Sequence, residues 1–296
     1  MTIFDSIEPG PNRFGRLTEF ANPVKLDKFI DKNYKKFCDN FRAKSYMSNV
    51  EWMMRHYLAS KKVALCAIFY TQAEFMLKLN MKNLSFYASY YAFFNGLSAN
   101  LVLSPLVDIH TISHSGLTEK IDNLFVKRGV LPASSLELLG DLRFARELYS
   151  YHLPLSGRSL GDEGRDLDAE RLFERLAQLL PSALQASNML SYLSYGAYER
   201  KGIGTPDEYE QYQTQVDDRF QAIVGHYDSN GSRSHFDGGD YYQLGSYLTK
   251  FKKPMPLAWL IHDWTMDEIE SSWNDSENEI GYSIESASRY LADVME

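Results

Sequence analysis

The stretch 63-VALCAIFYTQAEFMLKLNMKNLSFYASYYAFFNGLSANLVL-103 contains two long apolar segments. The first runs from Val63 to about Leu79 and the second from Leu84 to about Leu103, with Asn80-Met-Lys-Asn83 between them. Both segments are too long for typical strands, and their polar connection is as short as the loop of an antiparallel helix pair. The stretch therefore predicts an all-α fold organised around this pair.

Helical patterns continue on both sides of the pair, and no strand-rich or βαβ pattern appears in this part of the chain. The capping box Ser48-Asn-Val-Glu51 predicts the start of a short helix before it. A second capping box, Ser134-Ser-Leu-Glu137, predicts a helix that ends near Pro154. The segment from Asp168 to about Ala186 is amphipathic, and Pro181 is expected to kink or break it.

With 296 residues, the chain can bury a full core as one large domain, or as one domain with additions at each end. We divide it into a basic N-terminal arm with helices (1–61), a helical bundle (62–190) and an acidic helical extension (191–296). Within the extension, residues 241–251 predict a helix and Lys252-Lys-Pro-Met-Pro256 predicts a hinge.

Charge is distributed unevenly around the net value of −8. Residues 1–61 contain 11 Lys and Arg against 7 Asp and Glu, a balance of +4, whereas residues 190–296 contain 8 against 19, a balance of −11. The acidic region would repel nucleic acid, so an RNA contact is expected on the N-terminal arm or on the helix that contains Arg146. The alternative is that both regions are simply solvated helix faces.

Several functional classes are not supported by the sequence. The start, MTIFDSIEPGPNRF, lacks a basic segment followed by an apolar one, and no apolar run is long enough for a membrane span, so we expect a cytoplasmic protein without membrane contact. Cys38 and Cys66 lack metal-binding or redox spacing and are expected to be buried free thiols. His110 and His114 are four residues apart, but the serines and glycine around them indicate a turn rather than a metal site. The glycines of residues 229–240 indicate a flexible connector rather than a phosphate-binding loop.

The segment 136-LELLGDLRFARELYSYHLP-154 places Arg146 and His152 at the C-terminal end of an amphipathic helix. A guanidinium that can bind phosphate, close to a titratable imidazole, suits metal-free cleavage of RNA. Because Pro154 disfavours helical geometry at Leu153, the last turn can open and bring His152 towards the arginine. The alternative is that both side chains only solvate the carbonyl end of the helix.

The order of these pieces resembles the HEPN domains (higher eukaryotes and prokaryotes nucleotide-binding) over roughly residues 62–190. The family's second helix is similar to Phe86–Asn95, with its small residues and paired tyrosines, and its third long helix likewise ends in an arginine followed by an aromatic residue. The segments that carry the resemblance are Ala73–Lys78, Phe86–Asn95, His114–Leu117, Phe125, Gly129–Leu131, and Arg146 with Tyr151.

The resemblance implies an antiparallel helical bundle and a metal-independent endoribonuclease that needs no cofactor or metal. Active members carry an arginine and a histidine a few residues apart, and here five residues separate Arg146 from His152. His152 would act as general base or general acid, Arg146 would neutralise the phosphorane, and two such motifs would meet across a homodimer. We further expect Arg143, Tyr151 and Asn95 to bind the RNA substrate.

The known roles of other family members imply that the enzyme would be a toxin or a phage-defence effector, with a possible antitoxin or regulatory protein as partner. Glu147 departs from the neutral polar residue common in active members. Its carboxylate would oppose phosphate binding, unless it points away or tethers Arg146. The alternative function is a catalytically inactive HEPN-fold module that binds a nucleotide or a protein partner.

Overall fold

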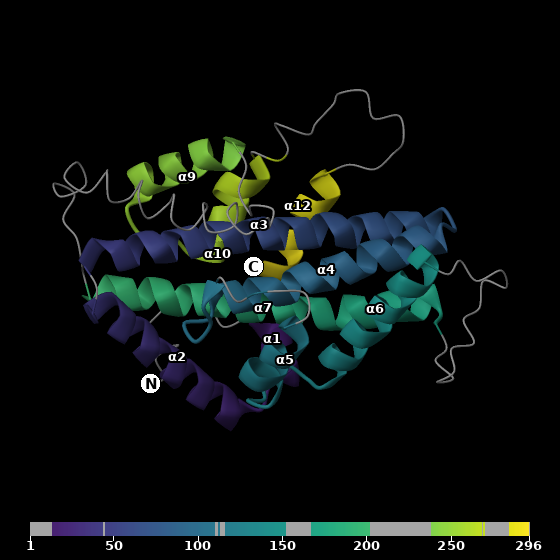
Figure 1. Ribbon diagram of the computed structural model, residues 1–296, viewed down its shortest axis with the longest axis horizontal. Coiled ribbons are helices and arrows are strands. Elements are labelled where there is room, and N and C mark those ends of the chain that lie inside the picture. The colour runs from purple at the N-terminus through teal and green to yellow at the C-terminus, as the bar shows by residue number, and fades with distance from the viewer. Residues whose placement is uncertain are drawn as a thin grey trace.

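The computed structural model describes residues 14–43, 45–109, 112, 116–151, 167–201, 238–267, 269 and 284–295. Every regular element in these residues is a helix, so the all-α prediction is confirmed. Three long helices form the centre of the molecule (Figure 1). They are α3 (Ser45–Lys78), α4 (Lys82–Leu103) and α7 (Ala169–Lys201). The expected antiparallel pair corresponds to α4 and the second half of α3.

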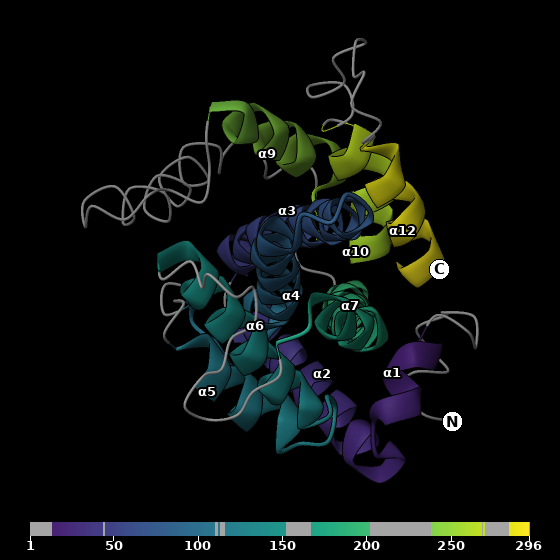
Figure 2. The ribbon, with the colours of Figure 1, turned by 90° about the vertical axis from the view of Figure 1, so that its right-hand side faces the viewer.

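Shorter helices cover the centre on two sides (Figure 2). On the side of α3 lie α9 (Gly238–Phe251), α10 (Leu257–Leu260), the π-helical turn η5 (Ile261–Thr265) and α12 (Glu285–Met295). On the side of α4 and α7 lie α1 (Gly15–Phe20), α2 (Pro23–Ala43), α5 (Leu117–Ile121), the π-helical turn η3 (Asp122–Val126) and α6 (Ser134–Tyr151). Within the described residues, no helix is both long and apolar enough to cross a membrane.

Helix α4 is the innermost element. From Ser85 to Leu103 every residue except Tyr87 and Tyr91 is buried, as expected for a helix surrounded by others. Among its buried polar side chains, Asn95 donates to the carbonyl of Tyr91 at 2.8 Å and Ser98 donates to that of Phe94 at 2.7 Å, both within the helix. The two tyrosines therefore mark the place where the central helix reaches the surface.

The three central helices pack closely around Gly96 of α4. A Cβ atom at this position would lie 2.9 Å from Cδ1 of Leu180 on α7 and 3.4 Å from Sγ of Cys66 on α3. One turn further, the side-chain amide of Asn100 donates to the carbonyl of Ala183 on α7 at 2.9 Å. The absence of a side chain at Gly96 thus permits contact between α4 and both neighbours.

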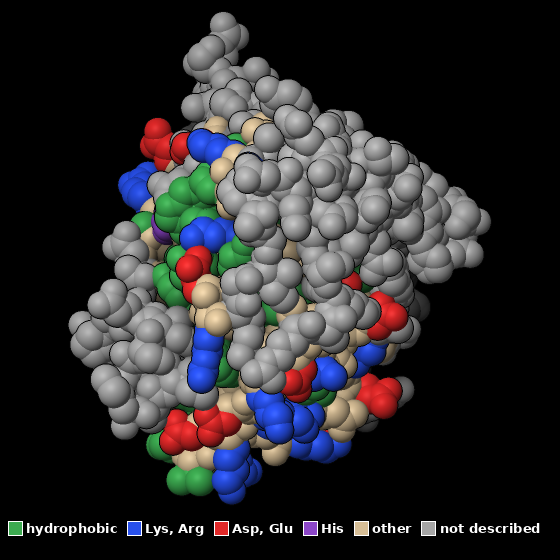
Figure 3. All heavy atoms as spheres, turned by 90° about the vertical axis from the view of Figure 1, so that its left-hand side faces the viewer, with side chains coloured by type: hydrophobic (Ala, Val, Ile, Leu, Met, Phe, Trp, Pro, Cys, Tyr) green, Lys and Arg blue, Asp and Glu red, His purple; other side chains and the backbone are tan. Residues whose placement is uncertain are grey.

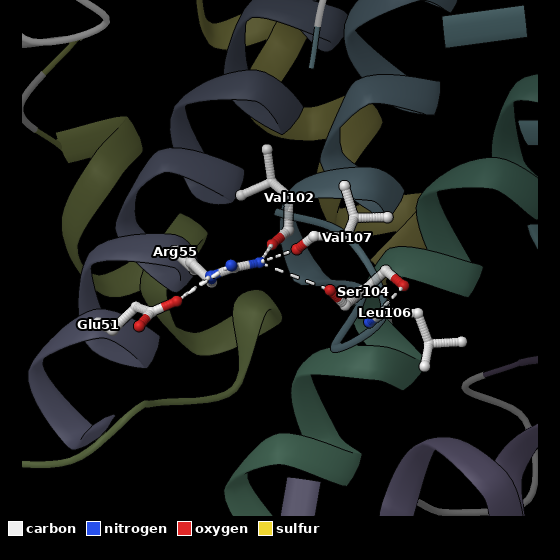
Figure 4. Close-up of polar contacts among 6 residues, drawn as sticks. All are labelled: Glu51, Arg55, Val102, Ser104, Leu106 and Val107. Atoms are coloured by element: carbon white, nitrogen blue, oxygen red, sulfur yellow. Dashed lines mark hydrogen bonds and ion pairs between the residues drawn. The ribbon is translucent and has the colours of Figure 1, made fainter. Parts of the chain in front are cut away.

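The C-terminal end of α4 is capped by Arg55 of α3 (Figure 4). The Arg55 side chain is buried, and its Nη1 donates to the carbonyls of Val102 at 3.2 Å and Val107 at 3.0 Å. Its Nη2 donates to Glu51 at 3.0 Å, which balances the buried charge. The arginine supplies donors for carbonyls that have no partner within α4.

Two helix boundaries differ from the sequence-based predictions. The short helix predicted to open at Ser48 is wrong, because α3 is continuous from Ser45 to Lys78. Residues 58–62, Leu-Ala-Ser-Lys-Lys, contain neither glycine nor proline and continue the helix. The expected break at Pro181 is also absent, since α7 runs through it to Lys201. Burial of the apolar residues on both sides offsets the hydrogen bond that proline removes.

The three segments drawn from the sequence share one hydrophobic core. Helix α3 crosses the boundary between residues 61 and 62, and core side chains come from every segment. Tyr70 of α3 stacks on Tyr290 of α12, with ring centroids 4.2 Å apart, and on Phe173 of α7 at 5.1 Å. The described residues therefore form one domain rather than a bundle with separately folded additions. Cys38 and Cys66 are buried free thiols within it, as predicted.

Gln185 of α7 joins the first and last described helices. Its Oε1 accepts a hydrogen bond from the backbone amide of Leu17 on α1 at 2.9 Å. Its Nε2 donates to the carbonyl of Val294 on α12 at 3.0 Å. Because Gln185 is buried, neither bond competes with water.

The predicted helix over residues 241–251 is confirmed as part of α9, but the predicted hinge after it is a fixed connection. The side-chain amide of Asn49 donates to the carbonyl of Lys252 at 2.7 Å. The amide of Met255 donates to the hydroxyl of Tyr247 at 2.8 Å, and Nδ1 of His56 lies 2.6 Å from the carbonyl of Met255. These bonds tie the connection to α3 and α9.

His56 makes the stability of this connection depend on pH. Burial lowers its pKa from 6.5 to about 4, against the opposing effect of the hydrogen bond with Met255. Between these values the unfolded chain binds more protons than the folded one, so stability is fully present above pH 6.5 and is lost as pH falls towards 4. From pH 7 to pH 5, we expect a loss of about 2 kcal/mol from this residue.

The measurement is urea unfolding of wild type and His56→Gln at both pH values. Glutamine does not titrate, so the unfolding free energy of the variant should fall about 2 kcal/mol less over this range. Equal pH dependence in the two proteins would contradict the assignment.

Candidate functional site

The candidate site lies where α4 reaches the surface and α6 packs against it. Tyr87 is 46% exposed and Tyr91 is partly buried, and their rings lie 4.7 Å apart. Phe86 of α4 stacks on Tyr149 of α6 with centroids 4.9 Å apart, which fixes the two helices against each other. The C-terminal half of α6 consequently presents its arginines to the tyrosines of α4.

Arg146 is held by this tyrosine cluster. Its guanidinium carbon lies 4.5 Å from the ring centroid of Tyr90, within range of a cation–π interaction. Its Nη1 donates to the hydroxyl of Tyr91 at 3.5 Å. Only 17% of the Arg146 side chain is exposed, so the guanidinium has a defined position rather than a mobile one.

Glu147 bridges both arginines of the site. One oxygen, Oε1, accepts from Nε of Arg143 at 2.9 Å and from Nη2 of Arg146 at 3.1 Å. The hydrogen bond from Arg143 lowers the pKa of Glu147 against the opposing effect of burial, and the positive charges of both arginines add to the lowering, so the carboxylate is ionised at neutral pH. Of the alternatives for this residue, the geometry matches a tether for Arg146. The three residues together carry a net charge of +1.

The tyrosines supply neutral donors to the site. Burial raises the pKa of Tyr90 despite the lowering effect of Arg146, and burial also raises that of Tyr87. Both hydroxyls remain protonated at neutral pH, and that of Tyr87, which is 46% exposed, can donate a hydrogen bond to a ligand, whereas Tyr90 is buried beneath Arg146. With Arg143, whose side chain is 56% exposed, the surface offers guanidinium and phenol donors to an anion.

The other site residues expected from the sequence have different positions. Asn95 is only 5% exposed and donates to the backbone carbonyl of Tyr91, so it supports the helix beneath that tyrosine. Tyr151 is the last residue of α6, and its side chain lies outside the described residues. His152 lies outside them as well.

Two further sequence-based candidates, the pair His110 and His114 and most of the 229–240 loop, also fall outside the described residues. Residues 238–240 belong to the first turn of α9, where Asp240 pairs with Lys61 at 2.5 Å and accepts from Tyr57 at 2.9 Å. These contacts fix α9 on α3. In the described part of the chain, no group of three or more His, Cys, Asp and Glu residues could hold a metal ion.

Sequence reasoning did not identify the contact between Arg146 and the tyrosines of α4. The signal was present, because Tyr87, Tyr90 and Tyr91 are spaced to share one side of a helix that is otherwise apolar or small. The spacing of the tyrosines does not reveal that α6, about 50 residues further along the chain, packs against them.

Comparisons of the chain with protein-family models, with curated proteins and with solved structures give no match. The functional assignment therefore depends on the chemistry of the site itself.

Proposed function

We propose that this protein is a metal-independent endoribonuclease of the HEPN type, with Arg146 and His152 as its catalytic residues. The observation that carries the proposal is the position of Arg146. Its guanidinium is held on Tyr90 and Tyr91, close to the end of α6 and six positions before His152. Such pre-organisation suits a group that stabilises charge in a transition state.

In the proposed reaction, an imidazole accepts the proton of a ribose 2′-hydroxyl while the oxygen attacks the adjacent phosphorus. The bond from phosphorus to the 5′-oxygen breaks, and a second acid protonates that oxygen. Arg146 neutralises the additional negative charge on the phosphorane. Arg143, more exposed, binds a neighbouring phosphate of the RNA strand.

The second acid or base comes from a second copy of the chain, since one motif supplies one histidine. We therefore propose a symmetric homodimer in which α6 and the tyrosines of α4 lie near the axis. A role as a toxin or phage-defence effector, controlled by an antitoxin or regulatory protein, completes this proposal.

A second candidate is a catalytically inactive module that binds a nucleotide or a protein partner. It is favoured by Glu147, which already occupies donors of both Arg143 and Arg146. An anion would have to share or displace these contacts.

Substitution of the two catalytic residues tests the enzymatic proposal. RNA cleavage in the presence of EDTA should fall about a hundredfold or more in Arg146→Ala and in His152→Ala, because each removes a group that acts in the transition state. Arg16→Ala is the matched control, since it removes an exposed arginine of α1 and should cut like wild type.

Cleavage by both active-site variants at the wild-type rate, or its abolition by EDTA, would refute the assignment.

Light scattering of the active protein tests the proposed homodimer. Full activity in a preparation that is monomeric would contradict the shared site.

Neutralising Glu147 tests whether its carboxylate restrains RNA binding at the arginine site. In Glu147→Gln, both guanidiniums lose their ionic partner, and the net charge of the site rises by one unit. We expect the affinity for single-stranded RNA, measured by fluorescence anisotropy, to increase several-fold at low salt and less at high salt.

Glu137→Gln changes the same charge at an exposed position in the first turn of α6 and should alter RNA affinity by less than about twofold. Weaker RNA binding by Glu147→Gln would show that the carboxylate positions Arg146 productively. Unchanged binding would argue against RNA contact at this surface.

A further inference from the structure

A second positively charged region lies on α2, away from the arginines of α6. It is a pocket of about 300 Å³ between one face of α2 and the turn after η3. Five of its six lining residues are cationic. The lining consists of Lys25, Lys28, Phe29, Lys32, Lys127 and Arg128. Figure 3 shows Lys and Arg side chains gathered in the lower part of one face of the molecule.

Helical spacing brings the three α2 lysines to the same pocket. Lys25, Lys28 and Lys32 are three and four residues apart, so they follow one another along one face of the helix. Asp27 belongs to a different face, because it lines a separate pocket formed with α1. Neither Asp27 nor Asp31 of α2 is among the residues that line the lysine pocket.

The turn that contributes Lys127 and Arg128 is fixed against the start of α2 by Gly129. Its carbonyl accepts from the amide of Asn22 at 3.1 Å. Gly129 has a φ of 68°, and a Cβ atom there would lie 2.6 Å from Cδ of Lys25. Glycine therefore permits both the left-handed turn and the close passage of the lysine.

The chemistry of the lining suits an anion. Lys127 pairs with Asp122 at 2.8 Å, whereas the other four cations form no ion pair within the described residues. Nη1 of Arg128 is buried and lacks a hydrogen-bond partner there, which is costly unless a ligand supplies an acceptor. Bound negative charge would further reduce the repulsion that solvent and salt already screen among the clustered cations.

The lining residues also indicate which class of anion fits the pocket. Phe29 forms an apolar floor, 4% exposed, with its ring 5.5 Å from that of Phe125, so it offers no open face for a nucleobase to stack on. No carboxylate or amide side chain lines the pocket to read a base or sugar. The recognised group must therefore be defined by its charge and its phosphate oxygens.

We propose that this pocket binds an oligophosphate chain, such as the triphosphate of a nucleotide or inorganic tripolyphosphate. Adjacent phosphates concentrate several negative charges in the space where the five cations converge. An RNA strand carries only one charge per nucleotide and would leave most of them unpaired. The site is distinct from the proposed ribonuclease site and does not depend on that function.

Titration calorimetry with sodium tripolyphosphate at low salt tests the proposal. Wild type should show one saturable site per chain, and Lys28→Gln/Lys32→Gln should bind at least about tenfold more weakly. Lys35→Gln/Lys36→Gln is the matched control, since it removes the same charge from the same helix outside the lining and should change affinity by less than about threefold. Arg128→Gln should reproduce the loss.

The substituted lysines are exposed, so the variants should unfold at the wild-type temperature without ligand, and only proteins that bind should gain in Tm when it is added. Equal binding of ATP and tripolyphosphate supports recognition of the phosphate chain. No saturable binding, or an equal loss in both double variants, overturns the proposal. Binding of a 5′-hydroxyl RNA oligonucleotide that depends on Lys28 and Lys32, without binding of tripolyphosphate, also overturns it in favour of an RNA backbone site.

Discussion

The contact of three helices at Gly96 determines the rest of the architecture. Because α4 meets α3 and α7 without an intervening side chain, it is enclosed almost all round. A helix enclosed in this way has little freedom to rotate about its axis. Tyr87 and Tyr91, the two residues between Ser85 and Leu103 that are not buried, therefore face a fixed direction. The docking of α6, and with it the place of Arg146, follows from that orientation.

The two positive surfaces of the protein differ in how their charge is balanced. The arginine site contains its own carboxylate, so each guanidinium is oriented before any ligand arrives. The α2 pocket has four cations without such a partner among the described residues and a fifth that is shared with Asp122. The carboxylate of the arginine site fixes the orientation of the guanidiniums but competes with any anion for their donors. Among the described residues, the unpaired cations of the α2 pocket have no such competitor, which favours high affinity for a group with concentrated negative charge. The acidic balance of residues 190–296 disfavours anion binding by that segment.

Local patterns predicted much of this fold. The apolar periods of α4 and α6 and the capping box at Ser134 were sufficient to place these helices, because the determinants lie within one or two turns. The continuity of α7 through Pro181 was not predictable in this way, since burial by distant segments outweighs the local cost. The same holds for the sites. Arg146 was singled out as a candidate in the sequence, whereas its contact with the tyrosines of α4 and the junction of α2 with Arg128 depend on contacts between remote segments.

The hydrogen bonds of Gln185 also have a consequence for biosynthesis. Helix α12 covers α3 and α7, yet it is made roughly 200 residues after α3, which corresponds to about 10 to 40 seconds of translation. During this interval Tyr70 lacks its stacking partner Tyr290, and Gln185, from the time that α7 is made, lacks one of its two backbone partners. The nascent chain thus carries an open apolar surface on its longest described helix until α12 has been made, and it is then that the described domain closes.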